Sequence, residues 1–292
     1  MWEKNVETFL GCESEYENAK IVLFGAPFDS TTSYRPGARF GSSAIRHESY
    51  GLETYSPYLD RDLLDYAVFD GGDLELPFGS TEGALAAIER AAGTAFQDGK
   101  IPVLLGGEHL VTLGAVRAAA KRYPDLHLLH FDAHADLRDE YLGVRLSHAS
   151  VIRRCYDLLG EDRIFQFGIR SGDRAEFRWA AEGHTKLQKF DFEGLSGIVS
   201  DLAKRKVPVY LTIDLDVLDP SVFPGTGTPE AGGVSFQALH EAIRTVLEGN
   251  EKTPGGCNVI GCDLVELAPP LDPTGASTAV ACKMVRELLL MA

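Results

Sequence analysis

Residues 127–136 read HLLHFDAHAD, an apolar run that passes directly into three alternating polar side chains. Asp132, His134 and Asp136 stand two positions apart, so in an extended chain they point to the same side. Strands covered by helices on both faces are apolar along most of their length, and open parallel sheets bind ligands at the carboxyl ends of their strands. The segment therefore predicts a buried parallel strand that ends at a ligand-binding edge.

The rest of the chain repeats this unit, with short apolar runs alternating with segments of helical spacing. The runs that predict strands are 21–24, 66–69, 102–105, 127–131, 164–167, 186–190, 207–213 and 259–264. The segments that predict helices are 83–96, 111–122, 149–159, 174–181, 195–204, 236–247 and 278–290. This βαβα order predicts an α/β fold, with a mainly parallel sheet of about eight strands covered by helices on both faces. Because no linker or repeat interrupts it, residues 1–292 are expected to form a single domain.

The composition is that of a globular protein with an acidic surface. Of 292 residues, 45% are hydrophobic, and 28 Lys and Arg stand against 43 Asp and Glu, a formal net charge of −15. Binding to nucleic acid or to an anionic membrane requires a basic face, so neither partner is expected, whereas a small cation is compatible. The chain begins without a signal-peptide pattern and has no apolar stretch that would cross a bilayer, so we expect a cytoplasmic protein. The five cysteines are irregularly spaced and are expected to be buried free thiols.

Other strand ends carry the same kinds of side chain. The run 207–213 leads into Asp214 and Asp216, and the run 102–105 leads through two glycines to His109. A parallel sheet brings such ends together at one edge, which gives four carboxylates and two imidazoles without a thiolate. This set suits a hard or borderline cation, Mn²⁺ above Zn²⁺, and its size favours two ions about 3.5–4 Å apart. The candidate metal ligands are His109, Asp132, His134, Asp136, Asp214 and Asp216.

Polar residues after a strand also form ordinary turns, and an isolated D-x-H-x-D segment leaves both interpretations open. The carboxylates on a second strand end favour the metal site here. The run from Asp70 to Asp73 is interpreted as a turn. The remaining histidines are interpreted as core residues (His127 and His130), a solvated helix face (His47 with Glu48) or surface positions (His184 and His240). The sequence contains no motif for nucleotide binding or serine hydrolysis.

Taken together, these segments resemble the ureohydrolase family, which includes arginases and agmatinases. The segments that carry the resemblance occur in the family's order: 35–41, 106–109, 131–136, 212–220, 225–230 with 232–233, and 263–266. They are spread over most of the chain. The resemblance implies a three-layer α/β/α fold of the arginase type with a binuclear Mn²⁺ site.

The resemblance also implies how the ligands are shared between the two ions. His109 and Asp136 would bind one ion, and His134 and Asp216 would bind the other. Asp132 and Asp214 would bridge the two ions. Glu108, Ala135 and Thr212 stand where Asp, Thr and Ser are common in the family. None of these departures removes a ligand, so the expectation of two Mn²⁺ ions is unchanged.

The stretch 137–148 bears on the substrate. It lacks the Asn/Ser pattern by which arginases hold the α-groups of arginine, and it resembles agmatinases instead. The resemblance thus implies hydrolysis of agmatine, a small cationic guanidino compound, to putrescine and urea by a hydroxide bridging the two ions. Glu266 is expected to pair with the guanidinium, His148 to carry a proton to the leaving amine, and Asp136 to orient the hydroxide.

Several alternatives stay open. The same centre would serve other guanidino acids, arginine or formiminoglutamate, and an inactive metal-binding relative would keep the same ligands. A binuclear phosphoesterase uses similar residues, but the acidic surroundings disfavour a phosphate ester. The alternative interpretation of His148 is a residue that begins the helix 149–159. The alternative for Glu266 is a strand-end carboxylate that pairs with an arginine. Because the family commonly forms trimers or hexamers, the resemblance alone implies a homo-oligomer.

Overall fold

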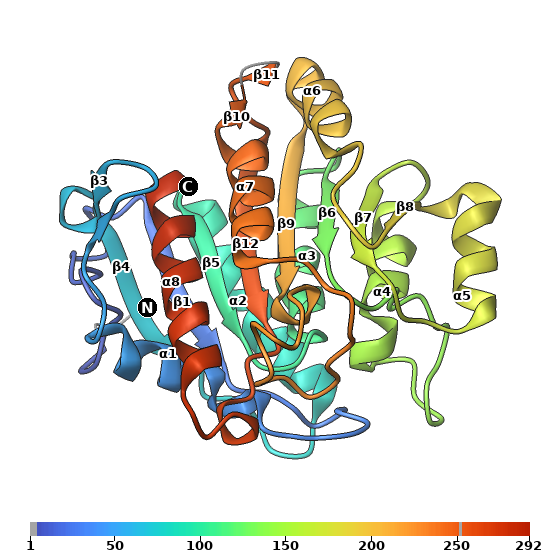
Figure 1. The fold of residues 1–292 in the computed structure, drawn as a ribbon, viewed down its shortest axis with the longest axis horizontal. Helices are drawn as coiled ribbons and strands as arrows, with labels where there is room; N and C mark the ends of the chain where they lie inside the picture. Colours follow the sequence, from blue (N-terminus) through green and yellow to red (C-terminus); the bar gives the residue numbers. More distant parts are fainter. Residues whose placement is uncertain (1–4, 251–252) are drawn as a thin grey trace.

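The central feature of the fold is one eight-stranded parallel sheet (Figure 1). The computed structural model describes residues 5–250 and 253–292. Neighbouring strands pair in parallel throughout, in the order β4-β1-β5-β12-β9-β6-β7-β8. The strands are β1 (Ile21–Ala26), β4 (Val68–Asp73), β5 (Ile101–Gly106), β6 (His127–Phe131), β7 (Ile164–Ile169), β8 (Lys186–Lys189), β9 (Pro208–Asp214) and β12 (Asn258–Val265). Two short antiparallel ladders lie outside the sheet: β2 (Tyr55–Ser56) with β3 (Arg61–Asp62), and β10 (Gly249–Asn250) with β11 (Thr253–Pro254).

Helices cover both faces of the sheet and enclose an apolar core on each side, which confirms the predicted three-layer α/β/α architecture (Figure 1). One face is covered by α2 (Thr81–Gln97), α3 (Val111–Arg122) and α4 (Val151–Leu159). The other is covered by α1 (Gly41–Ser49), α6 (Leu195–Arg205), α7 (Phe236–Leu247) and α8 (Ala276–Met291). The short helix α5 (Arg174–Trp179) lies beyond the edge strand β8.

The strand order explains why polar residues gather at one place. The four strands whose ends carry candidate site residues, β5, β12, β9 and β6, are neighbours at the centre of the sheet. Because they run parallel, their carboxyl ends lie at the same edge, where open α/β sheets bind ligands. The side chains of these four strands are largely buried on both faces of the sheet. The polar groups therefore stand at the ends of strands that are otherwise mostly apolar.

Two details of the first third of the chain differ from the prediction. Strand β4 begins at Val68, because the residues before it form a 3₁₀ turn at Leu63–Asp65. The interpretation of the run from Asp70 to Asp73 as a turn is wrong, since these residues belong to β4. His47 is exposed on α1, which confirms its interpretation as part of a solvated helix face. The whole helix was not predicted, because its inward side is mostly small or polar and lacks an apolar period.

The burial of the histidines outside the candidate site agrees with the prediction for some of them and not for others. His127 and His130 are buried in β6, which confirms their interpretation as core residues. The interpretation of His240 as a surface residue is wrong, because its ring is buried under Tyr58 and lies 3.4 Å from the carboxylate of Glu287 on α8. The burial of α7 against α8 could not be read from the local pattern around this histidine. All five cysteines are buried and free, as predicted.

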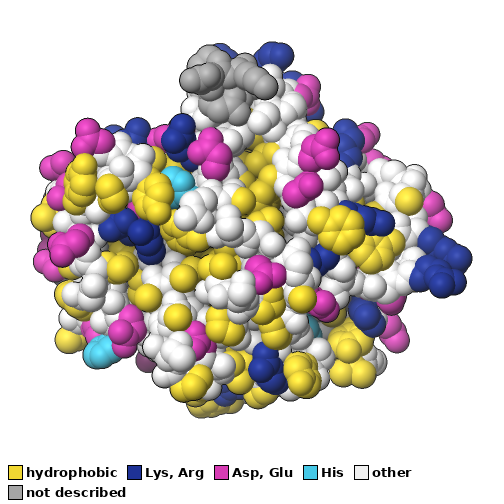
Figure 2. Space-filling model, in the orientation of Figure 1, with side chains coloured by type: hydrophobic (Ala, Val, Ile, Leu, Met, Phe, Trp, Pro, Cys, Tyr) yellow, Lys and Arg dark blue, Asp and Glu magenta, His cyan; other side chains and the backbone are white. Residues whose placement is uncertain are grey.

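The described surface carries both signs of charge. Figure 2 shows Lys and Arg side chains scattered among acidic ones on this face instead of gathered in a stripe. Within residues 5–250 and 253–292, no helix has the length and apolar character needed to span a bilayer.

A buried ion pair ties α1 to the edge of the sheet and supplies a stability prediction. Arg46 Nε lies 2.9 Å from Asp70 Oδ2, and both side chains are almost fully buried. The same carboxylate accepts a hydrogen bond from Phe9 N. Replacing Arg46 by methionine leaves this carboxylate buried without its cation, so we expect the free energy of unfolding to fall by about 3–5 kcal/mol.

Urea denaturation of Arg46→Met beside the wild type measures this change. Arg244→Met is the matched control, because Arg244 forms an exposed pair with Glu241 on α7 and should shift the free energy of unfolding by about 1 kcal/mol or less. Equal effects of the two substitutions would contradict a stabilising role for the buried pair.

Candidate metal centre and adjoining cavity

The inner half of the candidate metal centre gathers around His109. This residue lies between β5 and α3 and is 1% exposed. Its Nδ1 atom is 3.0 Å from Asp132 Oδ2 and 3.1 Å from Asp136 Oδ2. Asp214 Oδ2, at the end of β9, is 3.4 Å from the same nitrogen. Despite these distances, His109 Nδ1 makes no hydrogen bond in the described part of the chain, as expected of an atom that ligates an ion together with the carboxylates.

The outer half gathers around His134, which follows β6. His134 Nδ1 lies 3.0 Å from Asp216 Oδ2 and 3.5 Å from Asp132 Oδ1. Asp216 Oδ2 is buried and, among the described residues, has no hydrogen-bond partner. The two carboxylate oxygens of Asp132 thus face different imidazoles, which is the arrangement that a bridging ligand requires.

The electrostatics of the cluster call for cations. All four of its carboxylates are buried. Burial and the neighbouring Asp132 raise the pKa of Asp136 to about 7, and burial with Asp216 raises the pKa of Asp214 well above its usual range. Buried like charges are costly unless positive charge compensates them. Carboxylate oxygens and imidazole nitrogens without thiolates are the donors of hard or borderline divalent ions, so the residues present fit such a centre.

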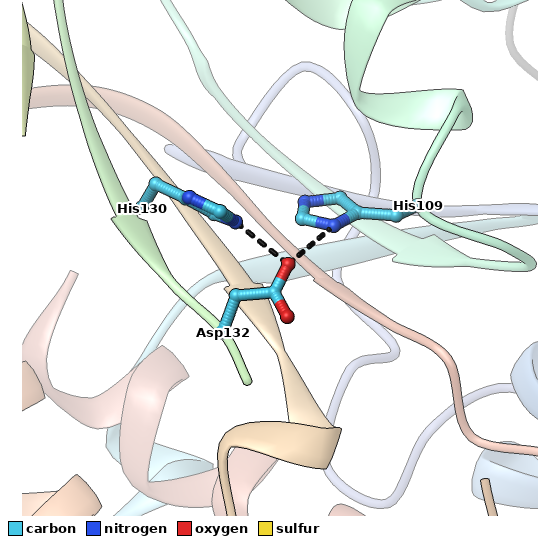
Figure 3. Close-up of side chains that lie close together, drawn as sticks. All are labelled: His109, His130 and Asp132. Carbon is cyan, nitrogen blue, oxygen red and sulfur yellow. Dashed lines mark hydrogen bonds and ion pairs between the residues drawn. The ribbon is translucent and has the colours of Figure 1, made fainter. Parts of the chain in front are cut away.

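Hydrogen bonds from deeper in the sheet orient the candidate ligands. His130 Nε2 lies 2.7 Å from Asp132 Oδ2, and Figure 3 shows the rings of His130 and His109 converging on this carboxylate. On the other side of His109, Nε2 lies 3.0 Å from Thr212 Oγ1, which donates to Asp263 Oδ1 over 2.6 Å. Partners of this kind fix the tautomer and direction of ligating histidines. Sequence reasoning gave His130 no such part, because a histidine inside an apolar strand is indistinguishable from a simple core residue.

Glu266 lies beside the candidate metal centre at the end of β12. Its Oε1 accepts a hydrogen bond from His109 N over 2.8 Å, and the residue is 4% exposed. No ion pair to an arginine holds this carboxylate within the described residues, so the alternative of an arginine partner is not supported. Glu266 (φ 68°) and Asp136 (φ 52°) both adopt left-handed backbone conformations, which are uncommon for residues with a side chain and are frequent at functional sites.

A cavity of about 260 Å³ opens next to His134 and Asp136. His148 lines it from the start of a 3₁₀ turn, His148–Ser150, which precedes α4. His148 therefore begins a helical turn, as one of its two interpretations held, and its place in the cavity wall is compatible with the other, a proton carrier. Burial and the nearby His134 lower the pKa of His148 to about 4, so its imidazole is neutral near pH 7.

The lining of the cavity includes three further charged side chains, those of Arg138, Asp173 and Glu176, to which sequence reasoning gave no part in a site. Arg138 Nε lies 3.4 Å from Glu176 Oε2, and its Nη1 lies 3.8 Å from Asp173 Oδ2. The guanidinium also stacks over Tyr141, 4.5 Å from the ring centroid. Asp173 caps α5 and Glu176 completes a capping box with it. Such residues look like ordinary surface and capping positions, and only the nearness of Arg138 to Asp136 in the sequence hints at the cavity.

Comparison with known proteins identifies the family to which the chain belongs. The sequence model described as Arginase family matches residues 19–291. The chain belongs to the arginase family. This result confirms the resemblance inferred from the strand-end segments, and the matches within the family show the chain to be an enzyme.

Individual members of the arginase family resemble the chain over nearly its whole length. An agmatinase of Bacillus cereus is 47% identical over 285 residues, which cover 97% of this chain and 96% of the relative. The human mitochondrial guanidino acid hydrolase is 34% identical over 290 residues, which cover 96% of this chain and 80% of the relative. The crystal structure of an agmatine ureohydrolase of Thermoplasma volcanium is 35% identical, with a TM-score of 0.87 and coverage of 98% of this chain and 94% of that one.

Proposed function

We propose that this protein hydrolyses the guanidino group of agmatine to putrescine and urea with the help of two Mn²⁺ ions. The observation that carries the proposal is the set of four buried carboxylates and two imidazoles in which Asp132 faces both halves. The agmatinase relatives at 46–47% identity support agmatine as the substrate.

The assignment of residues to the two ions is the one that the family resemblance implies, and the distances around His109 and His134 are compatible with it. His109 and Asp136 would ligate one ion, His134 and Asp216 the other, and Asp132 with Asp214 would bridge them. When bound, divalent ions supply Lewis acidity that lowers the pKa of water from 15.7 to about 7.

The chain's own side chains would bind the substrate and carry a proton from the attacking water to the leaving amine. The Glu266 carboxylate would accept two hydrogen bonds from the guanidinium and fix its plane, since planar guanidinium and carboxylate groups pair in a bidentate way. Asp136 would orient the attacking water by accepting a hydrogen bond. His148, a neutral imidazole at the cavity wall, would take up the proton that the attacking water releases and pass it to the leaving amine.

A substrate panel tests the proposed function. Protein loaded with Mn²⁺ is incubated with agmatine, arginine, 4-guanidinobutyrate and formiminoglutamate, and the urea or formamide released is measured. We expect agmatine to give the highest kcat/KM. Turnover of arginine alone would contradict the proposal, and no turnover of any of the four would favour a metal-binding protein without catalysis.

A guanidino acid is the second candidate substrate, because Arg138 lines the cavity and a cation there suits a carboxylate tail. In the free protein, however, this cation is already matched by Asp173 and Glu176. The balance of charge among these three side chains is negative. This favours a substrate whose tail is an ammonium group, as in agmatine.

Replacing Arg138 by methionine keeps much of the apolar stem and removes the cation. We expect the ratio of kcat/KM for agmatine to that for 4-guanidinobutyrate to rise roughly threefold to tenfold, because one partly exposed charge contributes about 1 kcal/mol. Arg145→Met is the matched control, since Arg145 is exposed and does not line the cavity. A ratio that stays constant or falls would show that Arg138 does not discriminate between the two tails.

A further inference from the structure

One loop holds His148 at two separate points. The loop follows β1, more than a hundred residues before His148 in the chain. His148 N donates a hydrogen bond to Thr31 Oγ1 over 3.0 Å, and His148 Nε2 lies 3.0 Å from Ser33 Oγ. The first contact fixes the main chain of this histidine, and the second fixes its ring.

The same loop is tied to the turn that carries a candidate metal ligand. Glu108, which directly precedes His109, is fully buried. Its Oε2 accepts hydrogen bonds from Thr31 N over 3.0 Å and from Thr32 Oγ1 over 2.9 Å. The loop that anchors His148 and the turn that carries His109 therefore form one hydrogen-bonded frame. A displacement of the loop would change the position of the ring relative to the metal centre.

Ser33 is the part of this frame that touches the ring and also lines the cavity beside it. The other ring contact is weaker, with Tyr141 lying edge-on at 6.4 Å between centroids. Without the Ser33 hydroxyl, the imidazole would lose its hydrogen bond from this wall and would be free to choose among other rotamers.

We propose that Ser33 is a positioning residue for His148, whose hydroxyl holds the imidazole at the cavity wall for proton transfer to the leaving amine. The inference rests on the proposed hydrolysis of a guanidino substrate. Catalytic groups work only within a narrow range of geometry, and a misplacement of about 1 Å costs roughly a hundredfold in rate. Ser33 would therefore affect turnover much more than substrate binding.

Steady-state kinetics of Ser33→Ala provide the first test. We expect kcat to fall roughly tenfold to a hundredfold while KM stays within about threefold, since the hydroxyl acts on proton transfer and not on holding the substrate. Ser33→Thr keeps a hydroxyl and should recover most of the lost kcat. Ser43→Ala is the matched control, because the exposed Ser43 hydroxyl on α1 donates to Phe40 O and to no other group among residues 5–250 and 253–292. Unchanged kcat in Ser33→Ala would overturn the proposal.

A double-mutant cycle separates positioning from an independent role. If Ser33 acts through His148, the Ser33→Ala substitution should cause no further loss of kcat in a His148→Ala background. An equal loss in both backgrounds would overturn the proposal, because Ser33 would then act without the imidazole.

The position of the ring gives a readout that does not depend on turnover. In a crystal structure of Ser33→Ala, we expect the His148 ring to leave its present position or to occupy several rotamers. A single ring in the present position would overturn the inference even if the enzyme were active. If the wild type hydrolysed no guanidino compound, the proposed function would fail, while the ring position would still decide whether Ser33 holds His148.

Discussion

The Asp132→Ala variant is expected to lose guanidino hydrolysis by roughly a thousandfold or more. Asp132 is the carboxylate whose two oxygens face the imidazoles of both halves of the candidate metal centre. Its removal would take away a shared ligand and weaken both ion sites together. Because metal ions contribute several kcal/mol to transition-state stabilisation and each 1.36 kcal/mol is tenfold in rate, a loss of about this size follows.

Metal content and thermal stability check the cause of this loss. Elemental analysis should show about two Mn²⁺ per wild-type chain and less than one in the variant, by the ligand count of a two-ion site. Adding Mn²⁺ should raise the Tm of the wild type, since an ion that binds only the folded state stabilises it, and chelation should reverse this rise. Both responses should largely disappear in Asp132→Ala.

The exposed Asp201 on α6 offers a matched control for this substitution. Asp201→Ala removes a carboxylate of the same type far from the candidate ligands in the fold and should keep wild-type metal content and turnover. If Asp132→Ala retained two ions and full activity, Asp132 would not be a bridging ligand.

Glu266→Gln is expected to lower kcat/KM for agmatine roughly a hundredfold to a thousandfold with the metal still bound. The substitution keeps the size of the side chain and an oxygen that can accept from His109 N, but it removes the negative charge that would pair with the guanidinium. Truncating one partner of a buried, hydrogen-bonded charge pair costs about 2–5 kcal/mol, and the expected loss of about 2.7–4.1 kcal/mol lies within that range.

The measurement is kcat/KM for agmatine beside the metal content of the same preparations. Glu89→Gln is the matched control, because Glu89 is a glutamate on α2 that pairs with Lys121 at the surface. Normal kinetics in Glu266→Gln would exclude the proposed guanidinium contact. Loss of Mn²⁺ from the variant would assign Glu266 to the metal centre instead.

The positions of the strands and most helices could be predicted because they depend on local pattern. An apolar run such as residues 127–131 specifies a buried strand by its own composition, and the alternation of such runs with helical periods specifies a parallel sheet. The prediction failed where burial depends on a partner element. His240 faces α8, and Asp70 pairs with Arg46, so neither environment is visible in the neighbouring sequence.

In the candidate site, too, some features could be predicted from the local sequence and others could not. The alternation of Asp132, His134 and Asp136 places three side chains on one side of a strand end whatever the rest of the fold does. The charges of the cavity wall had no comparable signal. Arg138 meets Asp173 and Glu176 only because the turn after β6 lies beside the start of α5 in the folded chain.

By itself, the amino-acid sequence determined the α/β class, the parallel strands and the identity of the polar residues at their ends, because each of these follows from periodicity over a few residues. Only the tertiary structure decided that Asp132 faces two imidazoles and that a loop after β1 holds His148. These contacts join segments up to 117 residues apart, and their distances depend on the order of the strands and on how the connecting helices pack. Short-range preferences do not encode that order, which is selected when the two apolar cores close over the sheet.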